Sequence, residues 1–278
     1  MNPHPSPLAS SLASSLTVYR GPAGDHNDRA MSAVTLLGEA FTSRLGVSPV
    51  LVGTPEPARP TGWDQELRRA LPTLRHMAER IDQVMTAGQA PISVITRCAV
   101  ALATQPVVLR HRPDAVVVWF DAHGDINVPA DTTTGYLGGL ALAGPLGWWD
   151  SGLGAGLPER QAVLVGARDL DPAEIEHVTA GRVALVPPGP ALDERLADVL
   201  RGRPAYLHID CDVMEPGLFA TDYTVPAGIG LEDLHACAKV LAASAPVGAE
   251  IAEFEGDGSA TADDLVAALE PLLAELRG

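Results

Sequence analysis

The stretch that decides the fold reads Ala115-Val116-Val117-Val118-Trp119-Phe120-Asp121-Ala122-His123-Gly124-Asp125. Its first six residues are apolar and rich in β-branched side chains, which is typical of a strand buried on both faces of a sheet. Three residues that can bind metal, Asp121, His123 and Asp125, follow at alternate positions, and alternate residues of an extended chain point to the same side. Open parallel sheets bind ligands just beyond the carboxyl ends of their strands, so this stretch predicts a buried parallel strand with a site at its end.

The rest of the chain continues the alternation of strands with helices. Strands are expected at residues 16–19, 49–52, 92–95, 115–120, 162–165, 183–186, 205–209 and 247–252, and helices at 28–45, 65–85, 98–111, 172–180, 190–201, 231–243 and 261–276. This alternation indicates an α/β fold in three α/β/α layers, with helices on both faces of a mostly parallel sheet. Residues 1–16 are expected to form a disordered lead, and residues 17–278 a single domain.

Composition and charge limit the classes of partner. The chain has 278 residues, 46% of them hydrophobic, and a formal net charge of −16. A surface this acidic repels phosphate, which argues against nucleic acid or an anionic membrane as the main partner. The charge is compatible with a cationic small-molecule substrate, although many cytosolic proteins are simply acidic. The oligomeric state stays open.

Cysteine usage and the N-terminal stretch bear on the cellular compartment. The three cysteines, Cys98, Cys211 and Cys237, form no disulfide pattern, and this low, odd number indicates a reducing cytoplasm. The N-terminal stretch lacks the basic and apolar regions of a signal peptide. No apolar run approaches the roughly 18 residues of a membrane span. A cytoplasmic location is therefore expected.

A second predicted strand ends in the same way as the first. Residues 205–209 lead into Asp210 and Asp212, again two positions apart. A single aspartate after a strand is often only a turn or a helix cap, but two strand ends with this pattern favour a shared metal site. Four carboxylates packed together repel one another unless a cation holds them. An oxygen-dominated set with one imidazole suits Mn²⁺, with other divalent metals possible, and four carboxylates are enough for two ions.

These two motifs resemble those of a known family. The segments Asp121 to Asn127 and Asp210 to Pro216 are similar to the arginase/agmatinase ureohydrolase superfamily, and the likeness covers about residues 90–275. The resemblance implies an arginase-like α/β/α fold, two Mn²⁺ ions and a bridging hydroxide that attacks a guanidinium carbon. It implies that Asp121 and Asp210 bridge both metal ions. The full set of metal ligands implied at these strand ends is Asp121, His123, Asp125, Asp210 and Asp212.

The resemblance also implies a guanidino amino acid as the small-molecule substrate. Asn127 and Thr134 match the positions that hold an α-carboxylate, and Tyr136 belongs to the same segment as Thr134. Asp169 and Asp171 match acidic residues that reach an α-amino group, which favours an amino acid over a decarboxylated amine. On its own, that acidic segment is equally typical of a capped helix start.

The reacting end of the substrate is expected near Glu253. This residue matches the catalytic carboxylate that pairs with a guanidinium, and the less favoured alternative is a solvated charge on a helix or at a strand end. Thr224 lies near the position where the family has another threonine on the substrate side. Asp125 or water would give the leaving amine its proton. His208, two residues before Asp210, is expected to be either a partner behind a ligand or a satisfied core histidine.

Cys98 departs from the family pattern. The first metal ligand of the family is a histidine in a Gly-Gly-Asp-His-Ser type of turn, but this chain carries Cys98 at that position. A thiolate is softer than manganese prefers, so a cysteine ligand extends the range of fitting metals to iron or even zinc. The alternative is a buried, inert cysteine beside a weakened site. We expect Cys98 to bind metal.

Gly138 is the second departure, because arginases carry a proton-shuttling histidine there. General acid–base help is typically worth roughly 10²–10⁴-fold in rate. An N-hydroxyguanidine is less basic than a guanidine and needs such help less. Both departures resemble one branch of the family, the Nω-hydroxy-L-arginine amidinohydrolases of D-cycloserine biosynthesis. This resemblance implies hydrolysis of Nω-hydroxy-L-arginine to L-ornithine and hydroxyurea, in antibiotic biosynthesis.

Two other functions stay open at this point. The chain could be an arginase or another guanidino-acid hydrolase, which a comparison of L-arginine with its N-hydroxy derivative would decide. A non-catalytic relative that binds a guanidino ligand is disfavoured by the intact set of five Asp and His residues, and metal analysis would test it.

Overall fold

The fold is built on an eight-stranded sheet. The computed structural model describes residues 13–277, and in this part of the chain every strand pair is parallel, in the order β2-β1-β3-β8-β7-β4-β5-β6. The strands are β1 (Ser14–Tyr19), β2 (Val50–Val52), β3 (Ala90–Val94), β4 (Val116–Phe120), β5 (Ala162–Val165), β6 (Ala184–Val186), β7 (Ala205–Asp210) and β8 (Gly248–Ala252). The predicted α/β fold class is confirmed.

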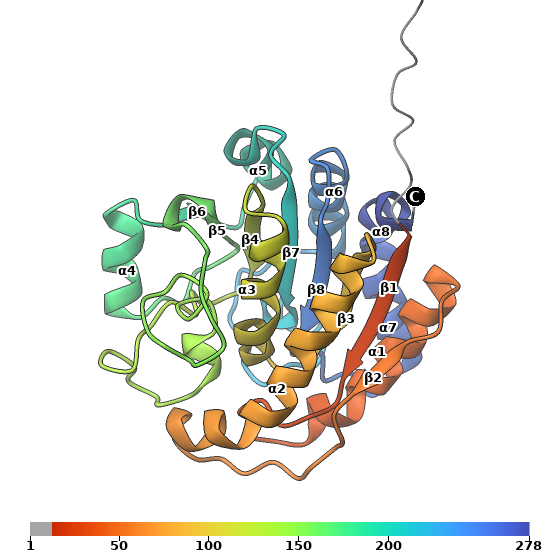
Figure 1. Cartoon of the computed structure of the whole chain (residues 1–278). Coiled ribbons are helices and arrows are strands. Elements are labelled where there is room, and N and C mark those ends of the chain that lie inside the picture. The colour runs from red at the N-terminus through yellow and green to blue at the C-terminus, as the bar shows by residue number, and fades with distance from the viewer. Residues whose placement is uncertain (1–12, 278) are drawn as a thin grey trace, which may run out of the picture.

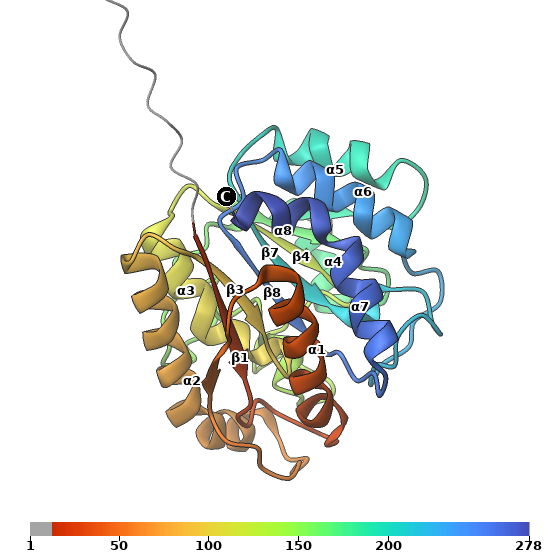
Figure 2. The same ribbon diagram turned by 90° about the vertical axis from the view of Figure 1, so that its right-hand side faces the viewer.

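Helices cover both faces of the sheet, which gives the three predicted layers (Figures 1 and 2). One face carries α1 (Arg29–Leu45), α5 (Leu192–Leu200), α6 (Leu231–Ala242), α7 (Ser259–Ala268) and α8 (Glu270–Arg277). The other face carries α2 (Trp63–Thr86) and α3 (Ala101–His111), and α4 (Pro172–Thr179) packs Val178 on the same side. Within residues 13–277, none of the helices is long and apolar enough to cross a membrane.

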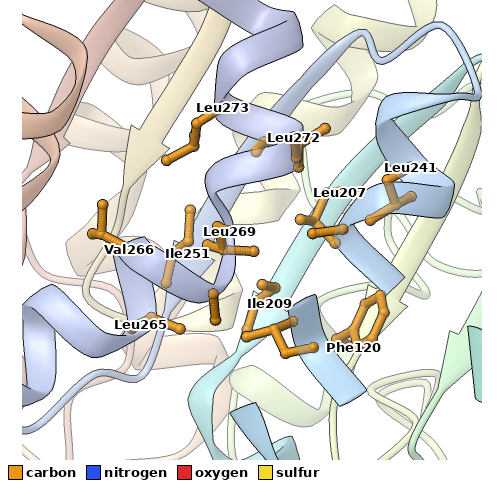
Figure 3. Close-up of a cluster of buried hydrophobic side chains, with 14 of the residues drawn as sticks. Phe120, Leu207, Ile209, Leu241, Ile251, Leu265, Val266, Leu269, Leu272 and Leu273 are labelled. Carbon is orange, nitrogen blue, oxygen red and sulfur yellow. The ribbon is translucent and has the colours of Figure 1, made fainter. Parts of the chain in front are cut away.

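Strand side chains alternate between two apolar cores, as the two-residue period of a strand requires. Val116, Val118 and Phe120 of β4 enter the core beneath α5 to α8, whereas Val117 and Trp119 enter the core beneath α2 and α3. Burial on both faces explains why this strand is a continuous apolar run. Figure 3 shows part of the first core, with Phe120, Leu207, Ile209, Leu241, Ile251, Leu265, Val266, Leu269, Leu272 and Leu273 labelled.

Most element boundaries differ from the prediction by one or two residues, and three differences change the description of the fold. β1 begins at Ser14, so the last residues expected in the disordered lead belong to the sheet, while residues 1–12 lie outside the described residues. The helix predicted over 98–111 starts with a 3₁₀ turn, Cys98–Val100, before α3. The helix predicted over 261–276 is two helices, α7 and α8. The break falls before Pro271, because proline lacks an N–H donor and disfavours a helical residue ahead of it.

The strand order brings four carboxyl ends together in the middle of the sheet. After β3 the chain forms β4, β5 and β6 toward one edge, and then returns to place β7 and β8 between β4 and β3. The segments that follow β3, β8, β7 and β4 therefore all begin at the carboxyl ends of neighbouring parallel strands (Figure 1). A change of direction of this kind is where open α/β sheets bind ligands.

Candidate active site

The acidic motif after β4 is held by hydrogen bonds from its own segment. Trp119 Nε1 donates to Asp121 Oδ2 at 2.9 Å, and the backbone N–H of His123 donates to Asp121 Oδ1 at 2.7 Å. Asp125 has a positive φ of 53°. Positive φ values are uncommon for residues other than glycine, and residues that adopt them are often found at functional sites. Both carboxylates are buried.

The motif after β7 completes the cluster. The backbone N–H of Asp212 donates to Asp210 Oδ1 at 2.8 Å, and Asp212 Oδ1 accepts the backbone N–H of Ala122 at 3.0 Å, which joins the two strand ends. His123 Nδ1 lies 3.1 Å from Asp212 Oδ2 and 3.2 Å from Asp121 Oδ1. The structure thus brings together the aspartates and the histidine that the sequence pointed to.

Crowding shifts the acid–base behaviour of this cluster. Burial and the charge of Asp121 raise the pKa of Asp212 to about 6. Burial and repulsion by Asp212 raise the pKa of Asp210 well above its usual range, and burial and the charge of Asp121 do the same to the pKa of Asp125. Burial opposes a charge on His123, but its hydrogen bonds to Asp121 and Asp212 outweigh burial and raise its pKa. Such a cluster holds either protons or cations.

The ligand atoms are spaced for metal ions. Three overlapping groups, each with its atoms within 4.8 Å of one another, occur among the described residues: Asp121, His123 and Asp212; Cys98, Asp121 and Asp125; Cys98, Asp210 and Glu253. Asp121 and Cys98 each belong to two groups, as expected where two ions lie side by side. Buried carboxylates, one imidazole and one thiol form a donor set that fits divalent cations.

Cys98 points into this cluster from the segment after β3. Its Sγ donates to Asp210 Oδ2 at 3.1 Å, and its backbone N–H donates to Glu253 Oε1 at 3.1 Å. Burial and the charge of Asp210 raise the pKa of the thiol well above its usual value, so a cation that binds the sulfur must displace a proton. The position of Cys98 agrees with the role that we predicted for it, and the role itself stays a prediction.

A second layer of polar side chains stands behind Cys98. His208 Nε2 lies 3.2 Å from Cys98 Sγ, and His208 Nδ1 lies 2.9 Å from Glu250 Oε1. The His208 ring stacks on Trp119 with their centroids 3.5 Å apart. His208 is therefore a neighbour of a candidate ligand. The sequence analysis gave Glu250 no role, although an acidic residue inside an otherwise apolar strand could have indicated a buried polar contact. Three further side chains donate hydrogen bonds to Glu250: Thr104, Gln105 and Tyr206.

A cavity of about 220 Å³ adjoins the cluster. Most of the residues predicted to contact the substrate line it: Asn127, Thr134, Tyr136, Asp169, Asp171 and Glu253. Thr224 is exposed and does not line the cavity, whereas its neighbours Asp222 and Tyr223 do, without having been predicted. The structure therefore brings the first six residues together and leaves Thr224 apart.

The outer part of the cavity offers unused hydrogen-bonding groups. Asn127 Nδ2 donates to Asp171 Oδ2 at 2.8 Å, while the buried Asn127 Oδ1 has no partner among the described residues. Thr134 Oγ1 accepts the backbone N–H of Tyr136 at 3.2 Å, which leaves its hydroxyl proton free to donate. Glu174, which belongs to the same acidic segment as Asp169 and Asp171, also lines the cavity. Burial raises the pKa of this carboxyl to about 7.

The space beside Gly138 is filled by Tyr136. Gly138 lines the cavity within the 3₁₀ turn Gly138–Leu140, and a Cβ at this position would overlap the Tyr136 ring. The ring centroid of Tyr136 lies 4.6 Å from that of His26, and its hydroxyl lies 3.5 Å from Glu253 Oε1. A histidine at position 138 would have to displace Tyr136, which the sequence did not reveal.

Comparisons with known proteins agree with this fold and cluster. A model of the arginase family matches residues 52–269. The Nω-hydroxy-L-arginine amidinohydrolase of Streptomyces lavendulae is 38% identical over 260 residues, which cover 93% of this chain and 95% of the relative. The arginase of Brevibacillus brevis is 30% identical over 155 residues, covering 50% of this chain and 52% of the relative.

Solved structures show the same fold. Arginase from Bacillus caldovelox matches with a TM-score of 0.82 at 22% identity, and the match covers 94% of this chain and 98% of that one. Arginase from Entamoeba histolytica, solved in complex with L-ornithine, matches with a TM-score of 0.81 at 18% identity, covering 95% and 99%.

The chain therefore belongs to the arginase family. It is a hydrolase that acts on C–N bonds of linear amidines, as are its named relatives. The family comprises dinuclear metal enzymes, and the cluster after β3, β4 and β7 is where this chain can hold metal ions. The family match begins at residue 52, well before the segment over which we noted the resemblance.

Proposed function

We propose that this enzyme hydrolyses Nω-hydroxy-L-arginine to L-ornithine and hydroxyurea, with two Mn²⁺ ions as cofactors. The observation that carries the proposal is the pair Gly138 and Tyr136. Position 138 has no side chain to shuttle a proton, and Tyr136 fills the space that such a side chain would need. Loss of a general acid favours a guanidine that is less basic and more easily hydrolysed. Likeness to the Streptomyces lavendulae enzyme over 93% of the chain supports the same substrate.

The metal ions would be held by the strand-end cluster. Oxygen-rich donors suit Mn²⁺, and the thiol of Cys98 is the softest donor in the set. Bound divalent cations supply a water-derived nucleophile at neutral pH. The ligands in this proposal are Cys98, Asp121, His123, Asp125, Asp210 and Asp212.

The outer part of the cavity would bind the amino-acid end of the substrate. The free hydroxyl proton of Thr134 and the second amide proton of Asn127 are donors for an α-carboxylate. Asp169 and Asp171, together with the unpartnered Asn127 Oδ1, are acceptors for an α-amino group. Tyr136 would pack along the side chain of the substrate. Thr224, which lies outside the lining residues, has no contact in this arrangement.

The inner part of the cavity would hold the reacting group. Glu253 Oε1 faces the cavity as an acceptor for a guanidine N–H. Water adds its oxygen to the guanidine carbon, the bond from this carbon to Nε breaks, and Nε takes up a proton to become the side-chain amine of L-ornithine. Asp125 lines the cavity beside the cluster, where its carboxylate can take a proton from the attacking water and pass it to the leaving nitrogen, so Asp125 is the proposed proton donor.

Hydrolysis of L-arginine is the second candidate function. The presence of a carboxylate, Glu253, at the inner end of the cavity favours it, because carboxylates pair with guanidinium groups.

Steady-state kinetics of the Mn²⁺-loaded enzyme on both substrates test the proposal. We expect kcat/KM for Nω-hydroxy-L-arginine to exceed that for L-arginine by at least about tenfold, with hydroxyurea as the product, and Asp121→Asn to abolish both reactions. Equal kcat/KM values for the two substrates would overturn the proposal in favour of an arginase. A folded protein that retains no stoichiometric metal and turns over neither substrate would indicate a non-catalytic relative.

A further inference from the structure

Arg97 is a buried cation beside the inner end of the cavity. It precedes Cys98, its side chain is fully buried, and its Nη1 donates to Glu253 Oε2 at 2.5 Å and to Glu255 Oε1 at 3.0 Å. Its Nε donates to Asp25 Oδ1 at 3.3 Å. Burial opposes the charge of Arg97, but Glu253 and Asp25 outweigh burial and raise its pKa, and an arginine guanidinium stays charged in proteins.

Only one of the three carboxylates that surround Arg97 belongs to the cavity. Glu253 lines it, whereas Asp25 and Glu255 do not. Glu255 is also committed elsewhere, because its Oε2 accepts a hydrogen bond from Arg29 Nε at 2.7 Å. Arg97 is therefore held in place from behind by Asp25 and Glu255, and it presents its charge to the substrate side through Glu253.

The contacts of Glu253 leave little room for a second guanidinium. Arg97 donates to Oε2, while Oε1 accepts the backbone N–H of Cys98 at 3.1 Å and lies 3.5 Å from the Tyr136 hydroxyl, which a substrate N–H would replace. A carboxylate binds a guanidinium best through two parallel hydrogen bonds, one to each oxygen. Here one oxygen is already bonded to a guanidinium, so a substrate finds a single available acceptor. A cationic substrate would also place its charge next to that of Arg97, at a buried position where like charges repel strongly.

We propose that Arg97 determines substrate specificity: by closing Glu253 into an internal ion pair, it makes the site select a neutral N-hydroxyguanidine over a cationic guanidinium. The hydroxyl substituent withdraws electrons and lowers the basicity of the guanidine, so Nω-hydroxy-L-arginine has a neutral form at pH values where L-arginine remains charged. The neutral group can donate one N–H to Glu253 Oε1 without bringing a second positive charge. Arg97 acts through Glu253 and is thus a positioning residue. The inference rests on the proposed function.

The test compares three variants with the wild-type enzyme. Arg97→Lys keeps the positive charge. The double variant Arg97→Gln/Asp25→Asn removes one positive and one negative charge together, so the buried Asp25 is not left without its partner. Glu255 keeps its ion pair with Arg29, and Glu253 becomes free for a substrate. Arg80→Gln is the matched control, because Arg80 is a partly buried arginine that contacts Ser15 and Thr17 away from the cavity. For each protein, kcat and KM are measured for Nω-hydroxy-L-arginine and L-arginine.

We expect wild type, Arg97→Lys and Arg80→Gln to prefer Nω-hydroxy-L-arginine. In the double variant the ratio of kcat/KM values should move toward L-arginine by at least about tenfold, mainly through KM, because this is the size of effect that removing a buried charge contact has on binding. An unchanged ratio in a folded double variant overturns the inference and leaves the proposed function intact. A wild-type enzyme that prefers L-arginine overturns the proposed function and the inference with it.

A pH profile of the wild-type enzyme tests the same idea without any variant. If the site selects the neutral form, KM for Nω-hydroxy-L-arginine should fall as the pH rises through the pKa of the free substrate. KM for L-arginine, which stays charged, should show no such fall. Parallel profiles for the two substrates would overturn the inference even if the double variant fails to fold.

Discussion

At the scale of single residues, Cys98 sets this centre apart from one with a histidine ligand. Its sulfur lies between Asp210, 3.1 Å away, and His208, 3.2 Å away, and His208 is itself held by Glu250. Partners of this kind orient a ligand and tune its basicity, and their loss typically lowers metal affinity or activity by roughly 10–100-fold. The thiol is therefore supported in the manner of a metal ligand.

The first prediction concerns this sulfur. When Co²⁺ replaces the native metal, a thiolate ligand gives a near-ultraviolet charge-transfer absorption that oxygen and nitrogen ligands do not. We expect this band in the wild-type protein and its loss in Cys98→Ser, together with at least about tenfold weaker metal binding. Titration with Co²⁺, followed by absorption and by calorimetry, measures both quantities.

Cys237→Ser is the control for this experiment, because Cys237 is buried in α6 on the face of the sheet that α5 to α8 cover. It should keep the band and the affinity. A wild-type protein that binds Co²⁺ tightly without the band would show that Cys98 is not a ligand.

Residue identity could be predicted where the signal is local in sequence. The spacing of Asp121, His123 and Asp125 after an apolar run was enough to place them together, and the structure does so. The partners of Cys98 and Glu253 could not be derived in this way. Glu250 and Arg97 become neighbours of the site only because β3, β8 and β7 are adjacent in the sheet, and this order is a property of the whole chain.

At the scale of elements, the start of α4 is joined to the loop after β4. Glu174 is buried in the first turn of α4. Its Oε2 accepts the backbone N–H of Asp171 at 3.0 Å, and its Oε1 accepts the backbone N–H of Ile126 at 3.0 Å. One carboxylate thus caps a helix and holds the segment that carries Asn127. The capped helix start that the sequence offered is therefore present, and the contact of this segment with a substrate stays a prediction.

The second prediction separates these two roles. Glu174→Ala should lower the free energy of unfolding by about 1–3 kcal/mol, because it removes the cap and leaves a buried N–H unpaired. It should also raise KM for amino-acid substrates several-fold, since Asp171 and Asn127 lose their alignment. Urea unfolding and steady-state kinetics measure the two effects.

The matched control is Asp233→Ala in α6, where Asp233 Oδ2 accepts the backbone N–H of Gly230 at 2.9 Å. This cap lies away from the cavity, so the variant should lose some stability without any change in KM. If Glu174→Ala leaves KM unchanged as well, the link between α4 and substrate binding is wrong.

Helices and strands were predicted well where the apolar pattern is strong, and poorly where the backbone properties of a single residue, such as proline, determine where a helix ends. All eight strands lie where expected within a few residues, and the signal is clearest for β4, whose burial on both faces makes it a continuous apolar run. The break between α7 and α8 was missed, since Leu265, Leu269 and Leu272 keep the helical period across it. Pro271 overrides that period by removing a hydrogen-bond donor.

At the scale of the whole molecule, buried carboxylates lie together at the carboxyl ends of the central strands. Burial and then the negative charge of Asp121 raise the pKa of Asp212 from 3.8 to about 6. Burial raises the pKa of Glu174 from 4.5 to about 7. Both groups are easier to protonate in the folded chain than in the unfolded one. Their contribution to stability is therefore complete below the unfolded pKa values and is lost as the pH rises through the folded ones.

The third prediction follows from this sign. The metal-free protein should lose thermal stability between pH 5 and pH 8, because the cluster ionises without compensation. Mn²⁺ should restore the loss, so the rise in Tm on adding Mn²⁺ should be larger at pH 8 than at pH 5. Thermal unfolding in EDTA and in Mn²⁺ at several pH values measures both trends.

Surface carboxylates with lowered pKa values do not contribute to the expected change in stability between pH 5 and pH 8. These groups, such as Asp64, Asp114 and Glu159, titrate below this range. Asp212→Asn should flatten the slope of the metal-free protein and reduce the gain in Tm from Mn²⁺. A metal-free protein whose Tm is constant or rises from pH 5 to pH 8 would contradict the electrostatic account.

The stack of Trp119 on His208 has a practical consequence. The indole is fully buried, donates its N–H to Asp121 and lies face to face with a neighbour of Cys98. The other three tryptophans, Trp63, Trp148 and Trp149, are partly exposed. Trp119 is thus a natural fluorophore built into the wall of the centre. Its emission can serve as a label-free optical reporter of cation loading in the unmodified chain, and a Trp63/Trp148/Trp149 triple phenylalanine background would isolate that signal.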